Sequence, residues 1–196
     1  MPEPKSERGW YSRGYLPHLE AGETVQFITF RLADSLPADV ARAMLNDDRA
    51  HSKFEAFLDA GRGECWLAEP EIATLVEEAL LHFDGIRYRV LAWCVMPNHV
   101  HVVIETLAGH SLSDVVRSWK SYTSTAANRR LGRSGAFWHR DYFDRYMRDQ
   151  KHLEATVDYV ERNPVKAGLA HAPQLWRWSS AWRRERQFWG GKGRID

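Results

Sequence analysis

The sequence predicts a single α+β domain in which helices cover one side of an antiparallel sheet. Short runs of β-branched and aromatic residues alternate with longer segments whose apolar residues recur at helical spacing. Two of the strand-like runs, 86–96 and 100–106, are separated only by a short break containing Pro97-Asn98, which is typical of an antiparallel hairpin. The length of 196 residues fits one domain.

The elements before this hairpin follow from local composition. The polar segment 1–22 contains several Gly and Pro residues and is expected to be an N-terminal arm. Residues 24–32 (TVQFITFRL) predict the first strand. The acidic, alanine-rich segment 37–60 has helical apolar spacing and is followed by glycines. A further helix is expected after Pro70, because apolar residues then recur at i, i+3, i+4, i+7 and i+8 along one face.

The elements after the hairpin are a helix, a strand and a last helix. Residues 111–131 predict a helix terminated by Gly132. A short strand is expected within 137–147, and a final helix over 150–163, where Pro164 should end it. We expect a domain over 23–170, with a helical elaboration at about 37–63, and a basic, tryptophan-rich tail over 171–196.

The overall composition excludes several classes of protein. Hydrophobic residues make up 44% of the chain and charged residues 27%, so a disordered chain is excluded. No apolar run approaches the ~20 residues that span a bilayer. The N-terminus lacks the apolar region of a secretory signal. Cys65 and Cys94 match no CxxC motif, so we expect a reduced cytoplasmic protein with no membrane partner.

Charge is distributed unevenly along the chain. Residues 34–84 contain twelve acidic and four basic residues, whereas 162–196 contain eight basic and two acidic ones, and 111–150 add eight basic against four acidic. The C-terminal half is therefore a candidate surface for nucleic acid, the alternative being an ordinary solvated face. Aromatic rings among these basic residues suit stacking on unpaired nucleotides, although some of the rings must be core residues. The tryptophans concerned are Trp138, Trp176, Trp178, Trp182 and Trp189.

Two histidines two residues apart form the sharpest motif. In a strand, His99 and His101 project to the same face, while the valines beside them face the other way. Two neutral imidazoles held on one strand form half of a divalent-metal site. From the residues alone, a pair of unrelated histidines, one hydrogen-bonded and one exposed, stays open.

A polar stripe on the last helix is the second motif. His152, Thr156, Tyr159 and Asn163 lie roughly 100° from the apolar stripe of the same helix. If this stripe faces the histidines, Asn163 can offer an oxygen to a metal, with a phenol beside it. The other interpretation makes Tyr159 an ordinary half-buried residue and Asn163 a helix cap before a proline.

Together the two motifs resemble the single-tyrosine HUH transposases, and in particular the REP-associated tyrosine transposases of bacteria, within the IS200-like superfamily. The His–hydrophobic–His signature is matched by MPNHVHVVI, and the tyrosine helix by VDYVERNPVKAG. The resemblance extends in one order over nearly the whole chain. The further matches are LPH at 16–18, ITFRL at 28–32, SWKSYT at 118–123, FWHRDYFDRYMRD at 137–149 and WRWSS at 176–180.

This resemblance implies both a fold and a reaction. The fold would be an RRM-like or ferredoxin-like sheet with the histidines on a central strand. His99 and His101 would bind Mg²⁺ or Mn²⁺, with Asn163 as third ligand, and Tyr159 would be the nucleophile. The reaction would cleave single-stranded DNA beside a palindromic hairpin, leaving a 5′-phosphotyrosine and a free 3′-hydroxyl. A nucleoid-associated bacterial protein is expected.

Candidate DNA contacts are basic and aromatic residues within the matching segments. Basic side chains would hold phosphates, and aromatic rings would stack on nucleobases. They are Lys120, Tyr122, Trp138, Arg140, Arg145, Arg148, Arg162 and Lys166. The segment 37–63 is longer than a minimal core of this family needs, and its acidity argues against DNA contact. Asp144 and Asp158 are acidic neighbours whose role the sequence leaves open.

Two other functions compete with this hypothesis. A non-catalytic relative would bind single strands or hairpins without cutting, but binding alone does not require His99, His101, Tyr159 and Asn163 together. A metal-dependent oxygenase or cupin-like enzyme normally needs a further histidine and a carboxylate in β-rich surroundings, which the helical, basic C-terminal half does not suit. The sequence leaves open whether the chain is a monomer or a homodimer in which one tyrosine helix completes the partner's site.

Overall fold

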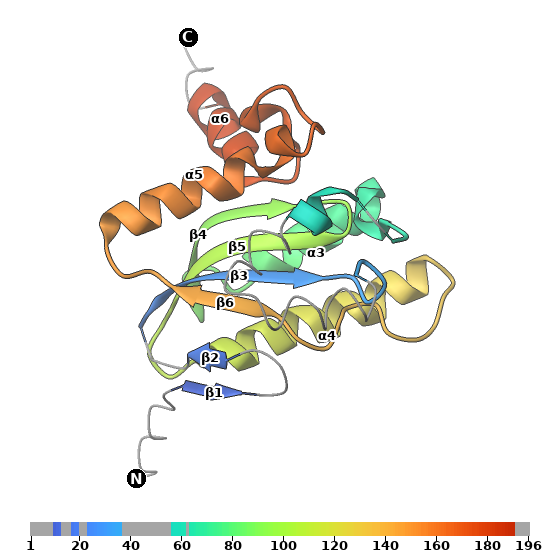
Figure 1. The fold of residues 1–196 in the computed structure, drawn as a ribbon, viewed down its shortest axis with the longest axis horizontal. Helices are drawn as coiled ribbons and strands as arrows, with labels where there is room; N and C mark the ends of the chain where they lie inside the picture. The colour runs from blue at the N-terminus through green and yellow to red at the C-terminus, as the bar shows by residue number, and fades with distance from the viewer. Residues whose placement is uncertain (1–9, 13–16, 20–22, 37–55, 62, 191–196) are drawn as a thin grey trace.

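A four-stranded antiparallel sheet forms the centre of the molecule (Figure 1). The computed structural model describes residues 10–12, 17–19, 23–36, 56–61 and 63–190. The strands are β3 (Val25–Arg31), β4 (Tyr88–Val95), β5 (His99–Thr106) and β6 (Phe143–Tyr146), in the order β4-β5-β3-β6. The α+β class, the four strands and the hairpin of β4 with β5 confirm the sequence prediction.

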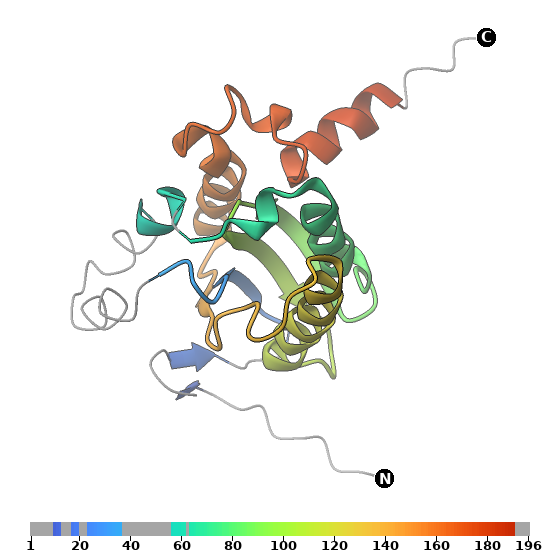
Figure 2. The same cartoon turned by 90° about the vertical axis from the view of Figure 1, so that its right-hand side faces the viewer.

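Helices lie on both faces of this sheet (Figure 2). On one face are α3 (Pro70–Leu81) and α4 (Leu112–Arg130), which pack on a large apolar cluster. The last predicted helix, α5 (Gln150–Lys166), crosses the opposite face over a smaller cluster that includes Phe27, Val103 and Val160. The sequence predicted helices on one side; α3 and α4 follow that prediction, while α5 lies across the histidine side.

The ends of α4 agree with the sequence, but the end of α5 does not. The hydroxyl of Ser111 accepts a hydrogen bond from the backbone of Asp114 (3.1 Å), which caps α4 at its predicted start. Helix α5 does not end at Pro164 but continues to Lys166. It closes where the left-handed Gly168 (φ 72°) lets the next N–H bond back to the carbonyl of Pro164 (2.8 Å). Proline removes one N–H donor from the helix, but the N–H of Ala167 still bonds to the carbonyl of Asn163 (2.9 Å), so the final turn persists.

The segments at the two ends of the chain carry smaller elements. Two short strands, β1 (Trp10–Ser12) and β2 (Pro17–Leu19), pair antiparallel within the predicted arm. The short 3₁₀ helix η1 (Trp66–Ala68) precedes α3. Most of the predicted helix over 37–60 lies outside the described residues, apart from helical residues 56–59. The division into arm, domain and tail stays a prediction. In the described part of the chain, no helix is both long and apolar enough to cross a membrane.

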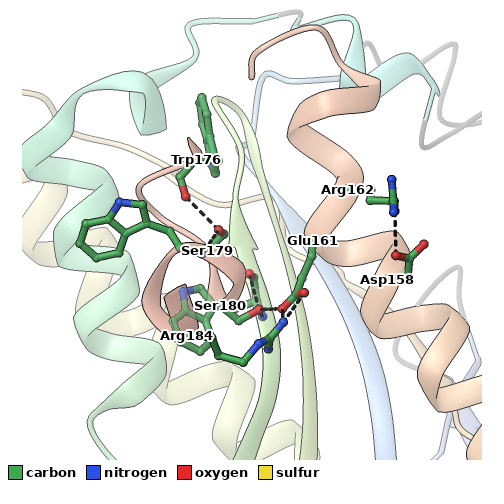
Figure 3. Close-up of polar contacts among 9 residues, drawn as sticks. Asp158, Glu161, Arg162, Trp176, Ser179, Ser180 and Arg184 are labelled. Carbon is green, nitrogen blue, oxygen red and sulfur yellow. Dashed lines mark hydrogen bonds and ion pairs between the residues drawn. The ribbon is translucent and has the colours of Figure 1, made fainter. Parts of the chain in front are cut away.

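The predicted tail packs on the sheet edge (Figure 3). It forms η2 (Pro173–Leu175) and α6 (Ser180–Gly190). The N–H of Val95 on β4 donates to the carbonyl of Trp178 (2.9 Å), and the indole of Trp176 donates to the carbonyl of Val95 (2.9 Å). These bonds satisfy backbone groups at the outer edge of β4, which is an edge strand of the sheet.

Candidate metal and tyrosine site

The two predicted histidines lie side by side in the middle of the sheet. In the β3–β5 pairing, Arg31 is opposite His99 and Thr29 is opposite His101. Both imidazoles are fully buried, and their Nε2 atoms are 3.0 Å apart. The alternation of side chains along β5 therefore produces the paired imidazoles that the sequence predicted.

Each imidazole is held by a polar neighbour on its other nitrogen. The Nδ1 of His99 is 2.7 Å from Oδ1 of Asn98, and the Nδ1 of His101 is 2.9 Å from the hydroxyl of Thr29. An amide oxygen only accepts hydrogen bonds, so Nδ1 of His99 is the donor in this contact, and in the neutral imidazole Nε2 then presents a lone pair. Metal-binding histidines are usually oriented in this way by a second hydrogen bond.

Asp59, a residue that no sequence motif singles out, adds a carboxylate to this cluster. Asp59 places Oδ1 3.9 Å from Nε2 of His99 and Oδ2 3.2 Å from Nζ of Lys166. One potential ligand atom from each of Asp59, His99 and His101 lies within 4.8 Å of the other two. In the sequence, the only signal for such a role is the acidity of the segment 37–63, which by itself argues against DNA contact.

Helix α5 brings the predicted nucleophile to the same face. The ring of Tyr159 is centred 5.6 Å from that of His101 and 6.1 Å from that of Phe27. Phe27 in turn stacks on His101 at 5.5 Å. Val160, fully buried, anchors the helix beside the tyrosine, and the carboxylate of Asp149 caps its start through the N–H of His152 (2.7 Å).

Asn163 is the third predicted metal ligand, and its environment fits that role. Its side chain is fully buried, and among the described residues neither amide atom has a hydrogen-bond partner. A buried amide without partners costs free energy, and coordination of a cation by its oxygen would offset part of that cost. The cap interpretation is not supported, because the N–H of Ala167 bonds to the backbone oxygen of Asn163. Two oriented imidazoles, an unpaired amide and a carboxylate suit a divalent cation.

Two of the eight candidate DNA contacts have structural partners inside the fold. Lys120 directs its ammonium to the carbonyls of His139 (2.7 Å) and Arg140 (2.8 Å), and burial lowers the pKa of this lysine to about 8. Trp138 is 6% exposed and donates to the hydroxyl of Thr123 (2.8 Å). Neither side chain presents a free surface to DNA.

The other candidates lie on the surface. Tyr122 is 60% exposed, and the remaining five are exposed cations. Of these, Lys166 is nearest to the histidines, and its Nζ lies 5.4 Å from the centre of the Tyr159 ring. The other four are Arg140, Arg145, Arg148 and Arg162.

The two acidic neighbours have different environments. Asp158 is exposed and accepts a hydrogen bond from Arg162 (2.7 Å), so it belongs to the outer surface of α5 (Figure 3). Asp144 is buried on β6 and accepts from the amide of Gln26 (3.3 Å).

A carboxylate two residues after Tyr159 links α5 to the C-terminal segment. Glu161 accepts hydrogen bonds from the hydroxyl of Ser180 and from the guanidinium of Arg184 (Figure 3). The same hydroxyl accepts from the N–H of Trp93 on β4 (3.2 Å). Glu161 thereby connects the tyrosine helix to the edge of the sheet, which the sequence motifs did not reveal.

Comparisons with known proteins agree with the motifs. A family model described as "Transposase IS200 like" matches residues 69–163. A Haemophilus influenzae protein described as a REP-associated tyrosine transposase is 26% identical over 122 residues, which is 53% of this chain and 68% of that protein. The solved structure of a REP-associated tyrosine transposase bound to a REP hairpin superposes with a TM-score of 0.56 at 18% identity. It covers 88% of this chain and 82% of that one, and this likeness establishes the fold.

Proposed function

We propose that this chain, whose residues 69–163 match the IS200-like transposase family model, is a metal-dependent single-strand DNA endonuclease and strand transferase acting at REP-type hairpins. The observation that carries this proposal is the position of Tyr159, whose ring lies 5.6 Å from that of His101 on the same sheet face. The hairpin bound to the structural relative supports the same class of substrate.

The reaction exchanges one phosphodiester for another. The Oη of Tyr159 attacks the scissile phosphorus, the bond from phosphorus to the 3′-oxygen breaks, and the 5′-phosphate becomes linked to the tyrosine. The phenol loses its proton, and the released 3′-oxygen takes one up. Because the phosphate stays esterified, a 3′-hydroxyl of another strand can reverse the step and join to it.

The buried cluster would hold the metal that this reaction requires. His99, His101 and Asn163 are the proposed ligands, and a bound Mg²⁺ or Mn²⁺ would offset negative charge on the scissile phosphate. Asn98 and Thr29 fix the imidazoles so that their Nε2 atoms face one another. The ammonium of Lys166, close to the Tyr159 ring, supplies positive charge that stabilises the attacking phenolate.

The path of the DNA strand is proposed from the surface cations around this site. Arg145 pairs with Phe27 in the β3–β6 register and therefore belongs to the histidine face of the sheet. Arg148 lies two residues before the start of α5. Together with Lys166, whose Nζ lies 5.4 Å from the centre of the Tyr159 ring, these cations would suit phosphate contacts. Lys120 and Trp138 are not part of this proposed path, because their polar groups already have partners within the fold.

The proposed site uses residues of a single chain. The tyrosine helix packs on the histidine face of its own sheet and is tied to β4 through Glu161 and Ser180. We therefore expect cleavage in cis. Mixing a Tyr159→Phe protein with a His101→Ala protein should restore no cleavage, and restored cleavage would instead show exchange of the helix between two chains.

The direct test uses a labelled single-stranded REP-type hairpin with Mn²⁺, separated on a denaturing gel. The wild-type protein should give a covalent protein–DNA band that EDTA and Tyr159→Phe both abolish. Tyr146→Phe, a matched loss of one hydroxyl on β6, should keep the band. If the wild type shifts the hairpin on a native gel but never cleaves it, the protein is a non-catalytic hairpin binder.

A further inference from the structure

We propose that Asp59 is a metal ligand of this site, shared between the cation and Lys166, and that it favours a hard cation such as Mn²⁺ or Mg²⁺. The inference rests on the proposed function for the presence of a metal. It gives a role to the acidic elaboration, for which the sequence provided none.

The position of Asp59 is fixed by contacts on both sides of it. The preceding residue, Leu58, is 1% exposed. Further along, Gly63 has a φ of 88°, and a Cβ there would lie 3.0 Å from the backbone oxygen of Asp34. The N–H of Glu64 donates to the carboxylate of Asp34 (3.0 Å). The loop is thereby pinned against the segment that follows β3, which keeps Asp59 over the histidine face.

The two carboxylate oxygens of Asp59 have different neighbours. Oδ1 lies 3.9 Å from Nε2 of His99, while Oδ2 lies 3.2 Å from Nζ of Lys166. The Asp59 side chain is only 10% exposed, whereas that of Lys166 is 54% exposed. A buried carboxylate requires compensating positive charge, which Lys166 provides from the solvent side and a cation between the imidazoles would provide from the inside.

The chemistry of the ligands explains why a carboxylate matters here. Two imidazoles alone suit zinc, copper, iron or nickel. A carboxylate oxygen and the amide oxygen of Asn163 shift the preference toward hard cations. A cation bound by the Asp59 carboxylate competes with the ammonium of Lys166 for the same negative charge. Binding of the metal should therefore weaken the ion pair, and the ion pair should weaken binding of the metal.

Titration of the full-length protein with Mn²⁺ in the absence of DNA, followed by calorimetry and by the EPR signal of free Mn²⁺, tests this role. Asp59→Asn keeps the shape of the side chain and should weaken Mn²⁺ binding at least tenfold. Glu64→Gln removes an exposed carboxylate from the same loop and should leave the affinity unchanged. The melting temperature of each metal-free variant shows that the protein is folded. Equal affinity of Asp59→Asn and the wild type would overturn the proposal.

Lys166→Met separates a ligand from a merely structural ion pair. If Asp59 binds the metal, removing the competing ammonium leaves Mn²⁺ binding at least as tight as in the wild type. If Lys166→Met weakens Mn²⁺ binding as strongly as Asp59→Asn, Mn²⁺ affinity depends on the ion pair between the two residues, and the proposed ligand role of Asp59 is wrong. A wild-type protein that binds no Mn²⁺ at millimolar concentration would contradict the metal-dependent function itself, which distinguishes the two failures.

Discussion

The side chains on the two faces of strand β3 have different surroundings. Phe30 points to the α3 and α4 side, where it contacts Trp138 (4.8 Å between ring centres) and Trp119 (6.3 Å) in the large apolar cluster. Phe27 points to the α5 side, where its neighbours are His101 and the partly exposed Tyr159. The same residue type on one strand is thus surrounded by core on one face and by the candidate site on the other.

This difference shows how a small sheet combines stability with a reactive surface. The α3 and α4 face buries apolar rings almost without interruption, whereas the α5 face also buries His99, His101, Thr29 and Asn163. Buried polar groups cost stability unless they are paired, and the amide of Asn163 is not paired within the described residues. The apolar face therefore compensates for the polar one, and substitutions on the two faces should have different consequences.

The largest stability effect is expected from Phe30→Ala. Removing this ring from a closed cluster leaves a cavity, and about 3–5 kcal/mol of unfolding free energy should be lost. Chemical denaturation followed by tryptophan fluorescence or circular dichroism measures it.

Phe27→Ala is the matched variant on the other face. It should cost less stability, because Tyr159 and Phe143 beside it are partly exposed and can close over the gap. It should nevertheless reduce hairpin cleavage strongly, since Phe27 supports both His101 and Tyr159. Equal stability losses for the two variants would remove the distinction between the faces.

A pH effect is expected on the α4 side. The folded pKa of Lys120 is about 8, below its ordinary 10.5, because burial disfavours the charged amine more than Asp141 favours it. Between these values the unfolded chain binds a proton that the native state does not, so this lysine makes stability rise with pH. Below about pH 8 its contribution is constant. Across that window the wild type should gain on the order of 1–3 kcal/mol relative to Lys120→Met. Parallel stability curves for the two proteins would contradict the shift.

A smaller loss of stability is expected from a substitution at the contact between α5 and the C-terminal segment. Glu161→Gln removes the charge that holds Arg184 and weakens the bond from Ser180, so about 1–2 kcal/mol should be lost. Cleavage should fall through kcat, with hairpin affinity unchanged, because the tyrosine is less well positioned.

Asp158→Asn is the control on the same helix, since it breaks an exposed pair with Arg162. It should change stability by no more than about 0.5 kcal/mol and leave cleavage unchanged. Similar kcat losses for Glu161→Gln and Asp158→Asn would show that the tie to the tail does not position Tyr159.

Local patterns predicted much of the fold and part of the site. Side chains alternate along a strand, so the shared face of His99 and His101 followed from spacing alone, as the β3–β5 register confirms. Helical spacing and a cap residue located α4 almost to the residue. The spacing of four residues placed Tyr159 and Asn163 on one stripe of α5.

Contacts between distant segments could not be predicted in this way. Asp59 reaches the histidines because a loop is pinned to Asp34, which no periodic pattern encodes. Composition suggested stacking rings in the tail, yet Trp176 and Trp178 use their indole N–H groups on Val95 and Thr74. The extension of α5 past Pro164, which carries Lys166 on the helix, depends on the turn at Gly168.

The most direct test of the site is to identify the residue that becomes attached to DNA. After reaction with a REP-type hairpin and Mn²⁺, nuclease and trypsin digestion followed by mass spectrometry would locate the attached nucleotide. Cleavage after Lys151 and Arg162 releases the peptide HLEATVDYVER, which contains Tyr159 as its only tyrosine. A nucleotide linked through its 5′-phosphate is expected on this peptide in the wild type, and none on it in the Tyr159→Phe protein. An adduct on a different peptide would contradict the assignment of Tyr159 as the nucleophile.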